Sequence, residues 1–201
     1  MNYWRILPLA AILYLAGCSS APPPEKKPVE PPKPVSGLSA IYKMYGIART
    51  WAPDAELLKA QSVNLQSVPS ENGKAGAWTA VFVSQSLGKS RPYSFSVVAD
   101  EGFHEGVFAQ HDQNWSGPTR QSSPIRTAAL KTDSEKAWTI AEGKSKDFIK
   151  KNPDVRVFYL LEQTDRFPNA TWRVIWGESI TKSGYSVFVD VPLGEFLQVA
   201  H

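Results

Sequence analysis

Two stretches of alternating apolar and polar residues occur along the chain, and each begins at a tryptophan. The first reads WTAVFVSQS from Trp78, and the second reads WRVIWGESI from Trp172. A turn, a Tyr-Ser pair, another alternating run, an aspartate and a turn glycine follow in both places. Alternation with a period of two predicts strands that bury one face, and the shared order predicts an internal duplication.

A helical pattern precedes each pair of strands. Residues 39–51 place apolar side chains at helical spacing, and residues 132–135 resemble a capping box that opens a second helix. Residues 57–68 and 155–161 read as further strands. We therefore expect each half to form one helix followed by three or four antiparallel strands. This is an α+β fold class with two similar helix-plus-sheet units.

The N-terminal segment has the layout of a secretory signal. Arg5 precedes an apolar run that ends at Leu15 and is shorter than the roughly 20 residues of a membrane-spanning helix. Residues 15–18, LAGC, resemble the lipobox of bacterial lipoproteins. The resemblance implies that Cys18 is acylated, for example with palmitate, and anchors the chain to a membrane. Ser19 after it implies the periplasmic face of the outer membrane.

A proline-rich linker follows. Residues 19–36 contain seven prolines and two valines, and they offer almost nothing to a hydrophobic core. Such a segment favours an extended polyproline II spacer that rises about 3.1 Å per residue. It could also serve as a ligand for an aromatic groove, although a spacer after a lipid anchor is the simpler interpretation.

These features divide the chain into four parts. We expect a signal peptide at 1–17, the lipidated cysteine with its linker at 18–36, a first repeat at 37–110 and a second repeat at 125–201. The polar stretch between the repeats is expected to be a connector.

The order of the second half resembles the PepSY-type module of bacterial envelope proteins. The resemblance covers residues 130–200 and rests on a helix, the aromatic strand at 172–177, and a closing strand with Val189, Asp190 and Gly194. It implies a helix packed on an antiparallel sheet, a place in the cell envelope, and a role in binding or restraining peptidases. It implies no catalytic residues.

Charge gives no indication of a nucleic-acid partner. From residue 38 onward the chain has eighteen Lys and Arg residues against seventeen Asp and Glu residues. Nucleic-acid binders concentrate basic residues on one face. The lysines near residues 144–151 are interspersed with acids, so we expect them on a solvated helix.

Two Ser-x-x-Lys tetrads have the spacing that penicillin-recognising enzymes use for a serine nucleophile. They are Ser86 to Lys89 and Ser179 to Lys182. Both are expected at strand ends rather than on a helix, so neither is assigned as catalytic.

Metal and acid–base candidates are equally weak. His104-Glu105 and His111-Asp112 offer ligand types without a third fixed ligand, so we expect no metal site and no cofactor. Glu162, Asp165 and Asp190 are expected at strand ends and turns as solvated acids.

Alternation places Trp172, Val174 and Trp176 on one face, which is expected to be core rather than a ligand-stacking surface. The features together favour a non-catalytic protein-binding or peptide-binding module, which restrains or escorts an envelope protein. The alternatives are a structural or assembly lipoprotein, and a hydrolase whose site the sequence does not reveal.

Overall fold

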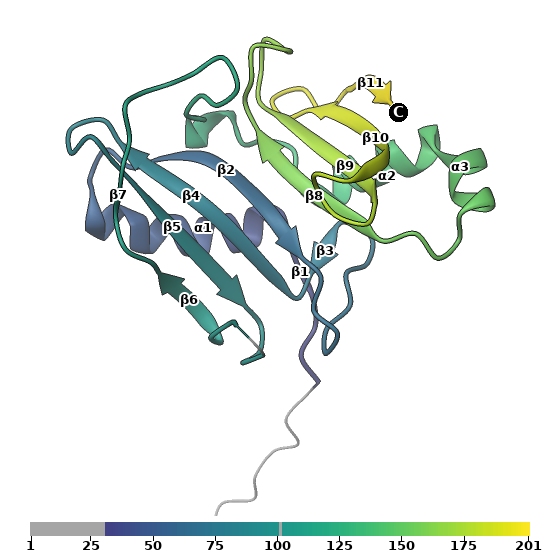
Figure 1. Cartoon of the computed structure of the whole chain (residues 1–201), viewed down its shortest axis with the longest axis horizontal. Helices are drawn as coiled ribbons and strands as arrows, with labels where there is room; N and C mark the ends of the chain where they lie inside the picture. The colour runs from purple at the N-terminus through teal and green to yellow at the C-terminus, as the bar shows by residue number, and fades with distance from the viewer. Residues whose placement is uncertain (1–30, 101) are drawn as a thin grey trace, which may run out of the picture. The chain divides into compact units, whose positions relative to one another are not determined.

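In the computed structural model the described residues are 31–100 and 102–201, and Cys18 lies outside them together with the signal peptide and most of the linker. Residues Pro31–His201 form one compact unit. The main feature of the described residues is an antiparallel sheet of nine strands with helices on one face (Figure 1). The α+β class expected from the sequence is confirmed.

The first half of this unit is a helix followed by strands. Its elements are β1 (Val35–Ser36), α1 (Gly37–Trp51), β2 (Glu56–Val63), β3 (Lys74–Ala75), β4 (Ala77–Ser84), β5 (Lys89–Ser96), β6 (Gly106–Ala109) and β7 (Gln113–Asn114). The strand predicted over 57–68 ends earlier, at Val63. There the next residue, Asn64, donates its side-chain amide to the Val157 carbonyl at 3.2 Å instead of continuing the ladder.

The second half repeats this order. Its elements are η1 (Thr127–Ala129), α2 (Ser134–Lys144), α3 (Lys146–Lys151), β8 (Val157–Glu162), β9 (Thr171–Gly177), β10 (Ser183–Asp190) and β11 (Phe196–Ala200). The single helix expected here is two helices separated by Ser145, whose φ of −120° and ψ of 11° are not helical. Gly143 and Ser145 have low helix propensity, which is consistent with a break at this point.

All strands of the main sheet except β7 follow the order β11-β10-β9-β8-β2-β4-β5-β6, and β7 pairs with β5. The two halves join through β2 and β8, where Lys59 faces Glu162, Ala60 faces Leu161 and Gln61 faces Leu160. The halves therefore share a continuous sheet instead of forming two separate ones. The proposed repeat boundaries at 37–110 and 125–201 stay a prediction.

The two tryptophans that begin the repeated pattern occupy matching places. Trp78 is the second residue of β4 and Trp172 is the second residue of β9. The tyrosines do not match. Tyr93 pairs with the residue two positions after Trp78, whereas Tyr185 pairs with the residue four positions after Trp172. The sequence similarity at the tyrosines is thus offset by two residues in the sheet.

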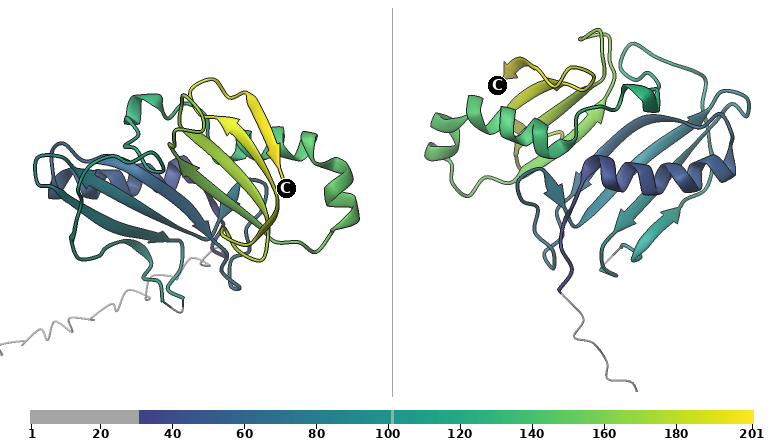
Figure 2. Two further views of the ribbon diagram at one scale, coloured as in Figure 1. Left: turned by 45° about the horizontal axis from the view of Figure 1, so that its top comes forward. Right: turned by 180° about the vertical axis from the view of Figure 1, so that it is seen from behind.

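The core lies between the sheet and its two long helices, α1 and α2, which cross the same face (Figure 2). The largest side chains on that face are fully buried, including Trp78, Trp172, Trp176, Tyr159 and Phe82. The expectation that the tryptophan-rich face is core is therefore correct.

Candidate functional site

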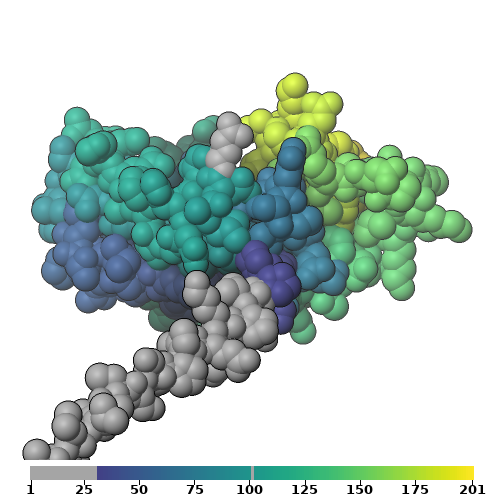
Figure 3. All heavy atoms as spheres, turned by 90° about the horizontal axis from the view of Figure 1, so that it is seen from below, coloured from purple at the N-terminus to yellow at the C-terminus, as the bar shows by residue number. Residues whose placement is uncertain are grey.

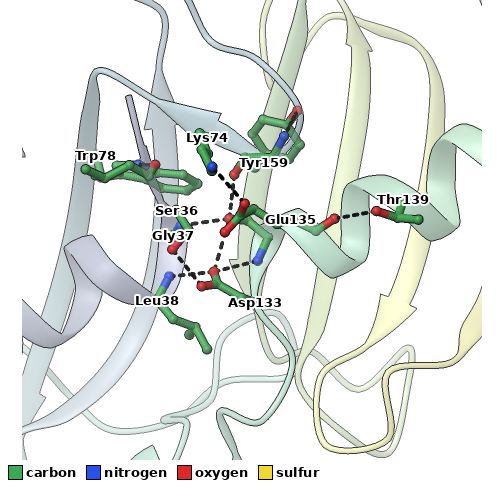
Figure 4. A network of polar contacts seen from close by, with 12 residues as sticks. Ser36, Gly37, Leu38, Lys74, Trp78, Asp133, Glu135, Thr139 and Tyr159 are labelled. Atoms are coloured by element: carbon green, nitrogen blue, oxygen red, sulfur yellow. Dashed lines mark hydrogen bonds and ion pairs between the residues drawn. The ribbon is translucent and has the colours of Figure 1, made fainter. Parts of the chain in front are cut away.

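Asp133, the residue before α2, binds the N-termini of both long helices (Figure 4). Its Oδ1 accepts hydrogen bonds from Ser134 N at 2.7 Å and Leu38 N at 2.9 Å, and its Oδ2 accepts one from the Ser36 hydroxyl at 2.6 Å. Amide groups in the first turn of a helix lack intrahelical partners, and the helix dipole favours negative charge there. One carboxylate therefore caps two helices from different halves of the chain.

The start of α1 depends on side chains of the second half. Ser36 is the N-cap residue of α1, but its hydroxyl does not cap its own helix. The first amide, Gly37 N, donates to the Ser134 hydroxyl at 2.7 Å, and that hydroxyl donates to the Gly73 carbonyl at 2.5 Å. The capping box expected at 132–135 is wrong, because Asp133 rather than Thr132 is the N-cap of α2 and the Glu135 carboxylate pairs with Lys74.

Trp78 and Trp172 pack against each other at this junction. Their ring centroids are 6.0 Å apart and their planes are inclined by 72°. Trp78 Nε1 donates to the Val35 carbonyl at 3.0 Å, and Trp172 Nε1 donates to the Thr132 carbonyl at 2.8 Å. Val35 and Thr132 each precede the N-cap residue of a long helix. The two indoles therefore make the same contact in both halves.

The remaining polar groups of the junction are also paired. Gly73 N donates to the Tyr159 hydroxyl at 2.9 Å, and burial raises the pKa of that hydroxyl. Lys74 Nζ lies 2.9 Å from a Glu135 carboxylate oxygen, which raises the pKa of Lys74. The junction thus joins the halves and leaves these groups little capacity for a ligand.

A different cluster lies on the face of the sheet opposite the helices, which we call the open face. Phe188 of β10 is directly opposite Arg173 of β9. The Arg173 guanidinium carbon is 5.6 Å from the centre of the Phe188 ring, and that of Arg166 is 4.3 Å from it. Arg173 also donates to the hydroxyls of Ser186 at 3.1 Å and Ser183 at 2.8 Å. Two guanidinium groups thus share one buried aromatic ring.

Glu162 of β8 and Lys59 of β2 extend this cluster across the seam between the halves. They are opposite each other in the sheet, yet among the described residues no ion pair links Glu162 to a cation. Burial raises the pKa of Glu162, and the charges of Arg173 and Lys59 oppose that effect. Burial likewise lowers the pKa of Arg173. The cluster has more positive than negative groups.

A surface hollow of about 690 Å³ lies beside Arg166. The connector at 119–123 and the loop at 163–168 line it, and two backbone hydrogen bonds join these segments. Asp165 lies 2.6 Å from the Arg120 guanidinium within the hollow. Most of the lining residues have hydroxyl, amide or charged side chains: Thr119, Arg120, Ser123, Gln163, Thr164, Asp165 and Arg166. Such a lining can hydrogen-bond to a polar ligand.

The first Ser-x-x-Lys tetrad does not form a catalytic pair. Ser86 lies in the turn after β4, where its amide donates to Asp54 at 2.8 Å. The Ser84 hydroxyl donates to the same carboxylate at 2.7 Å, and these bonds lower the pKa of Asp54 to about 2. Lys89 Nζ donates to Asn114 instead, at 2.7 Å.

The second tetrad is a turn. The Ser179 hydroxyl accepts the Lys182 amide at 3.1 Å, and Lys182 Nζ lies 3.6 Å from a Glu178 carboxylate oxygen. Both contacts stabilise the turn between β9 and β10.

The histidine and acid pairs are separated by other contacts. His104 packs on Phe108, with ring centroids 4.7 Å apart, whereas Asp112 binds the Arg91 guanidinium, which lowers the pKa of Asp112. Residues 31–100 and 102–201 contain no group of three or more potential metal ligands of the His, Cys, Asp or Glu type.

The three acids expected as solvated groups lie in different environments. Asp165 is exposed and paired with Arg120. Asp190 is buried, where it accepts hydrogen bonds from Asn169 Nδ2 at 2.9 Å and from Leu193 N at 2.8 Å. The expectation for Asp190 is therefore wrong, because this carboxylate stabilises the turn after β10. Glu162 is half-buried.

Cys18, the assigned lipidation site, lies outside the described residues. No helix in the described part of the chain is long and apolar enough to cross a membrane.

Sequence reasoning missed the cluster around Phe188. Alternation correctly placed Arg173 on the face opposite Trp172, but Arg166 belongs to a loop whose direction no periodic pattern specifies. An arginine within an otherwise apolar strand was the available signal.

Comparison with known proteins identified no family. No protein-family model matches the chain, and no curated protein matches it. A solved structure of a candidate lipoprotein from Clostridium difficile 630 is similar with a TM-score of 0.45 and 10% sequence identity. The match covers 80% of this chain and 91% of that one. At these values the similarity bears on neither family nor function.

Proposed function

We propose that the chain is a lipid-anchored protein of the bacterial cell envelope that binds a protein or peptide without chemical turnover. The hollow between 119–123 and 163–168 carries this proposal, because it is open, most of its lining residues have polar side chains, and it lies beside Arg166 of the arginine cluster. Binding sites combine a concavity with a few well-placed polar groups. The resemblance of residues 130–200 to PepSY-type modules agrees with a binding role.

The proposed anchor supports the same role. Acylation at Cys18 would hold the protein at a bilayer, and a proline-rich spacer would let the folded unit reach partners while staying concentrated there. Replacing Cys18 by Ser should release the protein from the membrane fraction or leave the precursor uncleaved. A processed variant that still partitions into membranes would contradict the anchor.

Photo-crosslinking in cells tests the binding role. A photoreactive residue at Thr164, which lines the hollow, should give a discrete adduct with an envelope protein. The same residue at the exposed Thr50 of α1 is the matched control and should not give that adduct. Identical products at both positions, or none at Thr164, would contradict binding at the hollow.

A further inference from the structure

Arg166 and Arg173 bring two positive charges to the same aromatic ring, Phe188. The guanidinium carbons of Arg166 and Arg173 lie 4.3 Å and 5.6 Å from the ring centre, and the positive charge of Arg166 adds to the effect of burial in lowering the pKa of Arg173. Cation–π contact with the ring compensates part of this repulsion. An anion bound to both groups would compensate more of it.

Nearby negative charge supplies only part of that compensation, since Glu162 raises the pKa of Arg173 against the effects of burial and of Arg166. Asp165 is paired with Arg120, and Asp190 is bonded to Asn169 and to a backbone amide. Among the described residues, Glu162 forms no ion pair with either arginine. Lys59, opposite Glu162, adds a further positive charge.

Hydrogen-bonding capacity is also left over. A guanidinium group has five N–H donors in a fixed fork that matches the oxygens of a carboxylate or phosphate. Arg173 uses two donor groups on Ser183 and Ser186, which fix its orientation. In residues 31–100 and 102–201 no carboxylate pairs with the exposed side chain of Arg166.

From this arrangement we infer that Arg166 and Arg173 form an oxyanion-binding site on the open face, which receives a carboxylate of an acidic peptide segment lying in the adjacent hollow. The inference rests on the proposed binding function and names its chemistry. Arg173, oriented by two serines, provides a fixed fork. Arg166 lies on the loop that lines the hollow. It provides the second fork and lies next to the part of the peptide that occupies the hollow.

The test uses the full chain in detergent micelles and three probes. The probes are an acetylated and amidated peptide with alternating glutamate and valine, the same peptide with glutamine in place of glutamate, and inorganic phosphate. Calorimetry gives affinities, and the ¹⁵N-labelled arginine Nε–H signals identify the groups that respond. The glutamate peptide should bind saturably and shift the Arg166 and Arg173 signals, whereas the glutamine peptide should not.

Matched variants assign the effect to these residues. Arg166→Ala should weaken glutamate-peptide binding by about tenfold or more, since a charge-assisted hydrogen bond is lost. Arg49→Ala removes an equal charge from the helix side of the sheet and should leave the affinity unchanged. Glu162→Gln should strengthen binding, because it removes the negative charge nearest to Arg173. Saturable binding of phosphate that is lost in Arg166→Ala would also support the oxyanion site and would identify a free anion as an occupant.

Equal affinity of Arg166→Ala, Arg49→Ala and the parent chain for the glutamate peptide would overturn the inference. So would binding of the glutamine peptide with equal strength, or no binding of either anion. The proposed function and the oxyanion site can fail independently of each other. If the Thr164 adduct forms equally well in an Arg166→Ala background, partner binding stands and the oxyanion site is rejected.

Discussion

Trp78 and Trp172 form an edge-to-face pair across the two halves of the chain, with ring centroids 6.0 Å apart. Each indole also binds the backbone just before the long helix of its own half. Each of these side chains therefore links three parts of the fold: the strand that carries it, the start of the long helix in its own half, and the other half of the chain. Figure 3, seen from below, shows the first described residues lying beside both the first-half and second-half segments.

Gly37 should be required for this pairing. A Cβ at Gly37 would lie 2.5 Å from Trp172 Cη2 and 3.0 Å from Trp78 Cη2. Because a packed core cannot accept the extra atom without displacement, Gly37→Ala should lower the free energy of unfolding by about 1–3 kcal/mol. Urea denaturation followed by tryptophan fluorescence measures this change.

Gly46 in the same helix is the control, since nothing lies within 4 Å of a Cβ placed there. Gly46→Ala should raise stability by about 0.5–1 kcal/mol, because alanine loses less backbone entropy in a helix. Equal effects of both substitutions would show that the tryptophan contact does not restrict residue 37.

Asp133→Ala should destabilise the fold more than loss of an ordinary cap. The carboxylate accepts bonds at the start of both α1 and α2. Since one N-cap contributes about 0.5–2 kcal/mol, we expect a loss of about 2–4 kcal/mol. Thermal and urea unfolding should show it.

Ser36→Ala removes a single donor to Asp133 and is the matched comparison. It should cost about 1 kcal/mol. A smaller loss for Asp133→Ala than for Ser36→Ala would contradict the double-capping role.

Local patterns predicted much of this fold. Alternation from Trp78 and Trp172 gave the matching strands and the buried face, because a strand with one apolar side has few alternatives. The helix over 39–51 was predicted for a similar reason, and its observed start at Gly37 is two residues earlier. That start depends on Asp133 and Ser134, which are distant in the sequence, so local spacing could not predict it.

The joining of β2 to β8 and the cluster at Phe188 were not predicted. Both depend on contacts between residues far apart in the chain: Lys59 and Glu162 in the first case, Arg166 and Phe188 in the second. Periodicity indicates which face of a strand is buried but not which strand becomes its neighbour. The offset between Tyr93 and Tyr185 shows the same limit within the repeat itself.

Asp54 should make folding stability depend on pH in the acidic range. Hydrogen bonds from Ser84 and Ser86 lower its pKa from 3.8 to about 2 in the folded chain. A carboxyl whose pKa is lower in the folded state contributes stability above its unfolded pKa, and that contribution is lost as pH falls toward the folded value. The stability difference between the parent chain and Asp54→Asn should therefore shrink between pH 3.8 and about 2.

Ser84→Ala provides the control, because the Ser84 hydroxyl is the largest cause of the shift. In this variant the pKa of Asp54, measured by carboxyl NMR titration, should move up toward 3.8. An unchanged titration in Ser84→Ala would contradict the assigned cause.

The last two residues of the expected linker, Val35 and Ser36, form β1 and belong to the folded unit. Val35 pairs with Ala75 in the ladder between β1 and β3, and its carbonyl accepts the Trp78 indole. Ser36 donates to Asp133.

A chain that begins at Gly37 loses all of these bonds, whereas a chain that begins at Pro31 keeps them. Relative to the full chain, the version from Gly37 should lose about 1–3 kcal/mol of unfolding free energy, corresponding to one or two net hydrogen bonds and the strand pairing. The version from Pro31 should retain the full value, and urea denaturation of the two versions decides between these outcomes. Equal stability of the two versions would show that residues 31–36 contribute nothing to the stability of the fold.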